Sequence, residues 1–371
     1  MPTRRFLYLD LDAFFCCCEI LRDRSLLTVP FAVGGSPHHR GVVSSASYPA
    51  RVLGVRSGMP MSRAVRLCPE LKVMHPHFDD YQLRSREVMA YLHTLAESVE
   101  QRSVDEAVLD ITDLPSDAAS LAEAIQATIR QRFRLPCSLG IASSITVSKI
   151  AVEVGKKRGA AGKVPQAITI VPAGTEAAFL APLPVGIMPG IGPKLEQSLQ
   201  AARILTLGDL ATWPLRDLQR RFGDYAVRLQ QRAVGRDTAV IASAHQRKAI
   251  SQEHTFADDI TDTATLLEAL HRQAEQVSTV LQRKHLYATV VKMKLRWDDF
   301  TTVTRQMPLP DTIDTAAPIF QAAQTLLAQT WDTEHPIRLI GVGVGGLQTM
   351  RQLRLWEPVA GHEGMPIGNT L

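Results

Sequence analysis

Alternation of hydrophobic and polar residues predicts short strands in the first half of the chain. Residues 5–10 form an apolar run that ends on a carboxylate, as in a buried strand, and residues 107–111 alternate like a half-buried strand. The stretch after the first strand is rich in cysteine and phenylalanine and has helical potential. Two further strands are predicted at residues 139–142 and 167–171.

Helical periodicity fills the intervals between these strands. It covers residues 77–98, and it returns after Pro115 with apolar side chains four residues apart from Leu121 to Phe133. A third helix is expected near 146–155. This order of strands and helices predicts one α+β sheet domain, in which the proline-broken residues of about 20–75 form an inserted lobe.

The pattern changes beyond Pro182 to short helices separated by glycine-containing turns, which predicts a small helical domain that ends near residue 236. Residues 237–250 have no clear period and contain a candidate linker. A second α+β module follows, and the last fifteen residues, rich in Gly, Pro and polar groups, are predicted to form an unpacked tail. The elements expected in this module are a strand-like start, helices at 263–283 and 315–330, and strands around 287–306 and at 337–344.

The composition is that of a globular protein of two or three domains. The 371 residues are 45% hydrophobic and 21% charged, which excludes wholesale disorder, collagen-like repeats and coiled coils. No apolar run approaches the roughly 20 residues of a membrane span, and Asp10 and Asp12 interrupt the apolar stretch that a signal peptide would need. Five cysteines, three of them adjacent at 16–18, fit neither a disulfide framework nor a CxxC metal site. We therefore expect a cytoplasmic protein without membrane segments.

Positive charge is concentrated in two stretches of the chain. The formal net charge is only +4, but residues 201–250 hold nine Lys or Arg against four Asp, and residues 281–310 hold six against two. The rest of the chain is therefore net negative. Such a division suits an enzyme that holds metal ions in one part and a polyanion in another, although two solvated faces would have the same composition.

Acidic residues mark the ends of two predicted strands. Asp10 and Asp12 end the first strand, and Asp105 and Glu106 precede the strand at 107–111. If these strand ends lie side by side, three or four carboxylates gather at one edge of the sheet and repel each other unless cations bind there. Oxygen ligands of this kind select Mg²⁺ or Mn²⁺, and a pair of such ions can promote an in-line displacement at phosphorus. Solvated turns contain the same short acidic pairs, so this pattern alone leaves both interpretations open.

Six short motifs follow one another between residues 10 and 305. They are Asp10-Leu-Asp-Ala-Phe-Phe15, Tyr48-Pro-Ala-Arg51, Ser103-Val-Asp-Glu106, Lys149-Ile-Ala151, Pro189-Gly-Ile-Gly-Pro-Lys194 and Arg296-Trp-x-x-Phe-Thr-Thr-Val-Thr-Arg305. In this order they resemble the motifs of the Y-family DNA polymerases, most closely the bacterial DinB or polymerase IV branch. The resemblance covers almost the entire chain.

The resemblance implies an α+β multidomain right-hand polymerase fold, with a ferredoxin-like palm, a small fingers insertion, a helical thumb with a helix-hairpin-helix motif, and an α+β little-finger domain. It implies template-directed addition of deoxynucleotides to a primer 3′-hydroxyl, with low-fidelity synthesis past lesions in DNA repair and the SOS response as the expected role. The expected bounds are 1–18 and 77–166 for the palm, 19–76 for the fingers, 167–236 for the thumb, 237–246 for a linker, 247–350 for the little finger and 351–371 for a C-terminal tail.

The resemblance also assigns a role to each acidic residue. Asp10, Asp105 and Glu106 are expected to be the catalytic metal ligands, with the backbone carbonyl of Leu11 assisting. The expected cofactor is a pair of Mg²⁺ ions, for which Mn²⁺ could substitute. Asp12 is expected to point away from Asp10 and to be structural.

Residues that would bind the incoming nucleotide are expected in the palm and the fingers. Tyr48 and Arg51 would grip the triphosphate, with Ser45 hydrogen-bonding beside them, because arginine offers a charge-assisted fork to phosphate. Lys156 would be a second cation at the triphosphate. Lys-Arg follows Lys156 where the family usually has Pro-Asn, so it stays open which of these cations touches phosphate.

Two phenylalanines follow the first acidic pair. Phe15 occupies the position of the family's steric gate, an aromatic ring under the sugar that collides with a 2′-hydroxyl, and Phe14 lies beside it in the expected nucleotide site. A core aromatic at a strand-helix junction is the alternative. The adjacent residues Cys16–Cys18 replace small residues common in the family and are interpreted as packed thiols.

DNA contacts are expected in the thumb and the little finger. Gly190 and Gly192 lie in a turn that looks like a helix-hairpin-helix, in which backbone amides approach a phosphate, and Lys194 follows them. The little finger is expected to bind DNA through the cations Lys292, Lys294, Arg296 and Arg305. The first three alternate with apolar residues, so a period of two places them on one sheet face. A plain helix-helix turn and a solvated sheet face are the alternatives.

The segment Gln352-Leu353-Arg-Leu355-Trp356 looks like the short motif by which such polymerases bind the sliding (β) clamp, because its aliphatic and aromatic residues can fill a hydrophobic groove. The expected partners are therefore primer-template DNA, deoxynucleoside triphosphates and the clamp. A monomer associated with the nucleoid is expected.

Two other functions share parts of this pattern. Adaptors of the ImuB type resemble these polymerases but have lost the acidic residues, which this chain retains at positions 10, 105 and 106. A nucleotide cyclase has a similar palm-like sheet with paired carboxylates, but it would not explain the hairpin turn, the basic strand or the clamp-like peptide.

Overall fold

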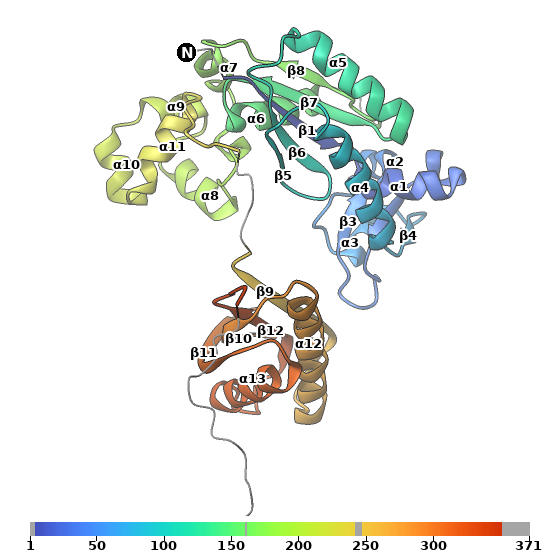
Figure 1. Cartoon of the computed structure of the whole chain (residues 1–371), viewed down its shortest axis with the longest axis vertical. Helices are drawn as coiled ribbons and strands as arrows, with labels where there is room; N and C mark the ends of the chain where they lie inside the picture. Colours follow the sequence, from blue (N-terminus) through green and yellow to red (C-terminus); the bar gives the residue numbers. More distant parts are fainter. Residues whose placement is uncertain (1–3, 160–161, 242–246, 351–371) are drawn as a thin grey trace, which may run out of the picture. The chain divides into compact units, whose positions relative to one another are not determined.

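The computed structural model describes residues 4–159, 162–241 and 247–350, and it divides the chain into two compact units, 1–245 and 246–371 (Figure 1). Each unit has its own hydrophobic core and its own main sheet, in which most or all neighbouring strands are antiparallel. The α+β class that the sequence predicts is confirmed. Among the described residues no helix is long and apolar enough to cross a membrane.

A five-stranded sheet in the order β5-β6-β1-β7-β8 organises the first unit. Its central strand β1 (Phe6–Leu11) is antiparallel to both neighbours, β6 (Glu106–Asp110) and β7 (Cys137–Ala142). Every residue of β1 is buried, because helices cover both faces of the sheet. The edge strands are β5 (Val99–Gln101) and β8 (Ile168–Ile170). All four strands predicted here from the sequence are confirmed.

The helices of this unit divide the side chains of β1 between two cores. Leu7, Leu9 and Leu11 pack with α4 (Phe78–Leu92) and α5 (Ala118–Thr128), whereas Phe6 and Tyr8 pack with α6 (Ile145–Arg158). The predicted helix with apolar residues at every fourth position continues past α5 as a π-helical turn, Ile129–Phe133. It ends where Arg134 adopts a left-handed conformation. The catalytic candidates of β1 therefore face α6.

The inserted lobe has a small core of its own. After α1 (Phe14–Arg22) and a 3-10 turn at Arg24–Thr28, three strands pair in the order β3-β2-β4. The elements of the lobe are β2 (Phe31–Gly34), β3 (Val43–Ala46), α2 (Tyr48–Val52), α3 (Met61–Leu67) and β4 (Lys72–Met74). This lobe corresponds to the insertion that the sequence predicts.

The helical segment shares its core with α6. It contains α7 (Glu176–Leu180), a 3-10 turn at Val185–Ile187, α8 (Pro193–Ala201), α9 (Leu207–Thr212), α10 (Leu215–Phe222) and α11 (Tyr225–Ala233). Its expected start at residue 167 differs from the structure, because β8 pairs in parallel with β7 and so belongs to the five-stranded sheet. The segment β7-α6-β8 is a strand-helix-strand crossover, which brings β8 back beside β7.

The second unit is a four-stranded antiparallel sheet in the order β11-β10-β12-β9, with its two helices packed into one core with it. The predicted helices at 263–283 and 315–330 are confirmed. Its elements are β9 (Ala249–Ile260), α12 (Thr263–Arg283), β10 (Ala288–Trp297), β11 (Thr302–Ile313), α13 (Ala316–Thr330) and β12 (Ile337–Gly345).

Replacing Leu295 by alanine is expected to destabilise the second unit by about 2–5 kcal/mol, because the side chain is fully buried in the central strand β10 and its loss leaves a cavity. Scanning calorimetry of the full chain would show this as a lower midpoint for the transition of this unit. The control Thr304→Ala, at an exposed position of β11, is expected to change the stability by less than about 0.5 kcal/mol. An equal shift for both variants would contradict the assignment of Leu295 to the core.

Candidate active site

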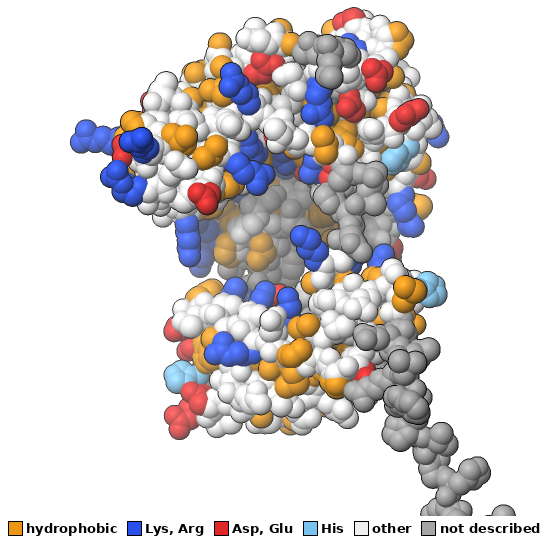
Figure 2. Space-filling model, turned by 60° about the vertical axis from the view of Figure 1, so that its left-hand side comes forward, with side chains coloured by type: hydrophobic (Ala, Val, Ile, Leu, Met, Phe, Trp, Pro, Cys, Tyr) orange, Lys and Arg blue, Asp and Glu red, His pale blue; other side chains and the backbone are white. Residues whose placement is uncertain are grey.

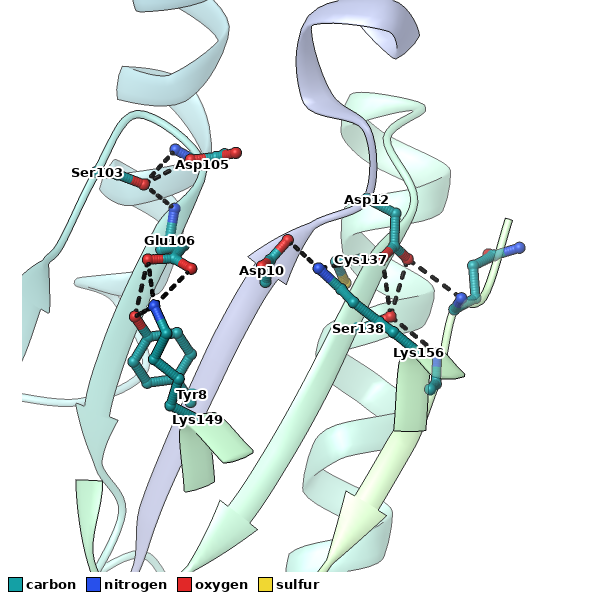
Figure 3. A network of polar contacts seen from close by, with 12 residues as sticks. Tyr8, Asp10, Asp12, Ser103, Asp105, Glu106, Cys137, Ser138, Lys149 and Lys156 are labelled. Carbon is teal, nitrogen blue, oxygen red and sulfur yellow. Dashed lines mark hydrogen bonds and ion pairs between the residues drawn. The ribbon is translucent and has the colours of Figure 1, made fainter. Parts of the chain in front are cut away.

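Three acidic residues, Asp10, Asp105 and Glu106, lie at neighbouring backbone positions where β1 ends and β6 begins (Figure 3). The antiparallel register places Asp10 directly opposite Glu106. Asp105 precedes Glu106, and its carbonyl oxygen accepts a 2.9 Å hydrogen bond from the amide of Leu11. The structure thus brings together the acidic pairs that lie about 95 residues apart in the sequence.

Two lysines of α6 pair with these carboxylates. Lys149 Nζ lies 2.9 Å from Glu106 Oε1 and 3.1 Å from Oε2. Lys156 pairs with Asp10 and lies 3.6 Å from Asp12 Oδ1. The lysines are seven residues apart, two helical turns, and therefore project from the same face of the helix. In the part of the chain that the structure describes, no three acidic, His or Cys side chains meet in the geometry of a bound metal ion.

The electrostatics of the cluster nevertheless suit a divalent cation. Burial raises the pKa of Asp10 to about 7, the Lys156 ammonium opposes this shift, and the charges of Asp105 and Glu106 add to it. A buried carboxylate beside other carboxylates is stabilised by a nearby positive charge. An all-oxygen set of this kind fits Mg²⁺ or Mn²⁺.

The side chain of Asp12 points to the same side as that of Asp10, not away from it as the sequence predicted. Residues two apart in an extended chain lie on the same side, so Asp12 and Asp10 both reach Lys156. Asp12 is fully buried, and its carboxylate accepts hydrogen bonds from Ser138 Oγ at 2.9 and 3.0 Å and from the amide of Gln166 at 3.1 Å. These contacts tie the end of β1 to β7 and to the chain before β8.

A cavity of about 190 Å³ opens beside the carboxylates. It gathers all the predicted metal and nucleotide residues except Glu106. Ser44 and Ser57 also line it and were missed, because neither lies in one of the six motifs. The predicted residues in its wall are Asp10, Leu11, Phe14, Phe15, Ser45, Tyr48, Arg51, Asp105 and Lys156.

The short helix α2 aims Tyr48 and Arg51 at this cavity. Ser47 caps the helix by accepting from the amide of Ala50. Arg51 Nε donates to the carbonyl of Ala46 at 2.9 Å, and its guanidinium lies 4.9 Å from the centre of the Tyr48 ring. Both side chains are thus held by the lobe before any ligand arrives.

An aromatic cluster fixes the ring of Phe15. The Phe15 ring stacks on Tyr81 of α4, with ring centroids 4.6 Å apart and planes inclined by 16°. The ring of Phe78 packs edge-on against Phe15, with centroids 5.9 Å apart. The Tyr81 hydroxyl donates to the buried carboxylate of Glu19. Sequence reasoning missed Tyr81, because it lies 66 residues beyond Phe15 in an ordinary helical pattern.

Glu106 lines a second cavity, of about 520 Å³, together with Tyr8 and Lys149. Residues of the five-stranded sheet, of α6 and of α11 share its wall, and most of the charged ones are cationic. No motif predicted it, although the sequence marks the helix with Arg228 and Arg232 as basic. Its charged residues are Arg102, Glu106, Lys149, Arg228, Arg232, Arg236 and Asp237.

The predicted hairpin turn lies before α8. Gly190 has φ 93°, a conformation that favours glycine, and Gly192 caps α8, whose first residue is Pro193. Lys194 is exposed in the first turn. The turn therefore presents backbone to solvent without a bulky side chain in the way.

On the second unit, three predicted cations share the sheet face that the helices leave uncovered. Lys292, Lys294 and Arg296 are half-buried, while the alternating residues Val291, Met293 and Leu295 are at most 1% exposed. Lysine and arginine side chains gather on the surface of this unit (Figure 2). The cations stand beside glycines of β12, since Lys292 pairs with Gly343 and Lys294 with Gly341.

Arg305 does not join this face. Arg305 pairs with Met293, and the side chains of residues directly opposite in a sheet point to the same face. The Arg305 side chain therefore points to the face that the helices cover. The β11 residue beside Lys294 is Thr304. The expected clamp residues Gln352, Leu353, Leu355 and Trp356 lie outside the described residues.

Three family models match the chain. The model described as "impB/mucB/samB family" matches residues 9–153, "IMS family HHH motif" matches 174–202, and "impB/mucB/samB family C-terminal domain" matches 247–355. The helix-hairpin-helix assignment of the Gly190 turn agrees with the second of these.

Curated relatives and solved structures extend these matches to nearly the whole chain. A protein of Halorhodospira halophila named DNA polymerase IV is 36% identical, over 94% of this chain and 96% of its own. One of Dehalococcoides mccartyi with the same name is 39% identical, over 93% and 87%. The structure titled "Y-family DNA polymerase chimera Dbh-Dpo4(243-245)-Dbh" superposes with a TM-score of 0.81 at 21% identity, over 92% of this chain and 99% of its own. "DinB from Sulfolobus solfataricus" superposes with 0.61, at 21% identity over 92% and 98%.

Proposed function

The chain belongs to the impB/mucB/samB family, the Y-family DNA polymerases that include its DNA polymerase IV relatives, and we propose how its residues carry out template-directed DNA synthesis. The protein is a DNA-directed DNA polymerase. The observation that carries its mechanism is that one cavity gathers two acidic residues and the predicted triphosphate-binding side chains. Low-fidelity synthesis past lesions is the role we assign to it.

Asp10, Asp105 and Glu106, with the carbonyl of Leu11, would hold two Mg²⁺ ions, and Mn²⁺ could replace them. When bound, such ions activate the primer 3′-hydroxyl and stabilise the charge that develops on the phosphates. The protein contributes a rigid frame for the ligands, because Asp10 lies near the end of a strand that is hydrogen-bonded on both sides. The 3′-hydroxyl attacks the α-phosphate of the deoxynucleotide, and pyrophosphate leaves.

The triphosphate would bind between the inserted lobe and α6. Arg51 and Tyr48 reach it from α2, Ser45 from β3, and Lys156 from α6. Lys156 is the cation of its run that lines the cavity, whereas the two residues after it are exposed. We therefore assign phosphate binding to Lys156 and place the sugar against Phe15.

Primer-template DNA would bind to the Gly190 turn and Lys194 in the first unit, and to Lys292, Lys294 and Arg296 in the second. These contacts reach the phosphate backbone and carry no sequence information. The support for this proposal is the exposed turn with its glycines and the alternation of cations with core residues on β10.

Replacing Lys292 by alanine is expected to weaken DNA binding about equally for all sequences and to reduce the slope of log affinity against log salt by about 1, because one phosphate contact is lost. Fluorescence anisotropy with labelled primer-template across a salt series measures the slope. Lys284→Ala, an exposed cation after α12, is the matched control, and Arg305→Ala is also expected to leave the slope unchanged. A larger change for Arg305→Ala than for Lys292→Ala would contradict the assigned binding face.

The sliding clamp is a further proposed partner, on the evidence of the sequence from Gln352 to Trp356 alone. A monomer in the cytoplasm, associated with the nucleoid and active in the SOS response, fits this set of partners. An inactive adaptor of the ImuB type would have no use for the acidic residues that line the cavity, and a nucleotide cyclase would not need the DNA-binding turn.

Primer extension with Mg²⁺ and the four deoxynucleotides tests the proposed role directly. The native chain is expected to extend primers on an undamaged template and to continue past a site that lacks its base. Extension that stops before the damaged site, with undamaged templates copied normally, would remove lesion bypass from the proposal and leave polymerisation intact. Nucleotide turnover without DNA would favour the cyclase.

A further inference from the structure

The hydroxyl group of Tyr8 lies between Glu106 and Lys149, and the mechanism above gives it no role (Figure 3). It donates a 2.9 Å hydrogen bond to Glu106 Oε2. Lys149 Nζ approaches the Tyr8 oxygen at 3.2 Å, in addition to its contacts with both oxygens of Glu106. The three groups form one closed hydrogen-bonded triangle at the edge of the carboxylate cluster.

The direction of the Tyr8 hydrogen bond is fixed by what its neighbours can do. An ammonium group has only donors, so the Tyr8 oxygen accepts from Lys149. The single hydroxyl proton of Tyr8 must then point to the carboxylate of Glu106, which accepts. Lys149 therefore sets the direction in which Tyr8 donates.

The ring of Tyr8 cannot move away from this position without disturbing the core. It is 3% exposed and packs with Phe6 and Val108 of the sheet and with Ile145 and Val152 of α6. The strand that carries Tyr8 also carries Asp10, two residues further on the same side. The hydroxyl that orients Glu106 and the carboxylate of Asp10 thus share one rigid element.

We propose that Tyr8 is a positioning residue, which restricts the rotation of the Glu106 carboxylate beside Asp10 and so favours the binding of a divalent cation there. The inference rests on the proposed role of Glu106 as a metal ligand. A glutamate side chain has three rotatable bonds, and a carboxylate that ligates a metal is usually held by a further hydrogen bond that reduces this freedom. Loss of such a partner typically weakens metal binding about 10–100-fold.

Tyr8→Phe is the test, because it removes the hydroxyl and keeps the buried ring. Mn²⁺ binding to the full chain with primer-template DNA, followed by the loss of the free-Mn²⁺ electron paramagnetic resonance signal, is expected to be at least about tenfold weaker. In primer extension, the Mn²⁺ concentration for half-maximal rate should rise by the same factor and excess Mn²⁺ should restore kcat. The KM for deoxynucleotide should not change. Tyr91→Phe, a partly buried tyrosine on the opposite face of the sheet, is the matched control.

Glu106→Gln separates this inference from the function on which it rests. If Glu106→Gln weakens Mn²⁺ binding and Tyr8→Phe does not, the positioning role of Tyr8 is wrong and the metal site stands. If neither variant weakens binding, Glu106 is not a metal ligand and both proposals fail. A drop in activity of Tyr8→Phe that excess Mn²⁺ does not restore would also overturn the positioning role.

A double-mutant cycle with Lys149→Met tests whether Lys149 and Tyr8 act on Glu106 together. Because Lys149 orients the Tyr8 hydroxyl, the fold-loss of Mn²⁺ affinity in the double variant should be smaller than the product of the fold-losses in the two single variants. Independent effects in the double variant would overturn the link from Lys149 through Tyr8.

Discussion

Primer extension is expected to fall by at least about 10³-fold when Asp105 and Glu106 are both replaced by alanine, because the loss of metal ligands removes several kcal/mol of transition-state stabilisation. Asp10, which ends the neighbouring strand, would be left without its two acidic partners. Single-turnover extension of a labelled primer measures the effect. Binding of primer-template DNA should persist, since the residues assigned to it lie in the hairpin turn and on β10.

The matched control for this prediction is Asp113→Ala combined with Glu123→Ala. Both residues are exposed and lie in the first unit away from the cavity, so the control removes the same charge without touching the carboxylate cluster. It should extend primers at the native rate. Full activity of the Asp105 and Glu106 variant would show that the cluster is not the catalytic centre. Absence of extension even by the native chain, with DNA still bound, would support the adaptor instead.

Replacing Phe15 by valine is expected to raise the incorporation of ribonucleotides relative to deoxynucleotides by about 10²-fold, the order that one steric contact in a binding pocket supplies. The ring lines the nucleotide cavity and is backed by Tyr81 and Phe78, so it cannot move aside for a 2′-hydroxyl. The ratio of kcat/KM for ATP and dATP opposite template thymine measures the change.

Tyr81→Phe is the control for this second prediction, because it keeps the stacked ring under Phe15 and removes only the hydrogen bond to Glu19. It should leave the preference for deoxynucleotides within a few-fold of native. If Phe15→Val also leaves the preference unchanged, Phe15 is a core aromatic and another group excludes the ribose.

The sequence predicts those parts of the fold in which a single element carries its own periodicity. The helix at 263–283 and the alternation of cations and core residues on β10 are examples, because burial of one face fixes both patterns. The convergence of Asp10 and Glu106 was also predictable, since each stands at a strand end and antiparallel pairing makes those ends neighbours.

Contacts that depend on register or on the placement of a distant helix were not predictable. Arg305 was expected to bind DNA together with Lys292, Lys294 and Arg296, but the pairing of β10 with β11 puts Thr304 beside Lys294, and a shift of one residue reverses the face. Tyr81 reaches Phe15 only because α4 packs against α1. The link from Lys149 to Glu106 likewise depends on how α6 lies across the sheet.

The central position of β1 has a consequence for how the protein loses activity. Its amide hydrogens are bonded to strands on both sides, so they should exchange with solvent only when the whole sheet opens. The inserted lobe, with its small separate core, can open at lower cost. Mild heating is therefore expected to unfold the lobe that carries Arg51 first and so to inactivate the protein. Activity should return on cooling, because the strand that carries Asp10 stays folded.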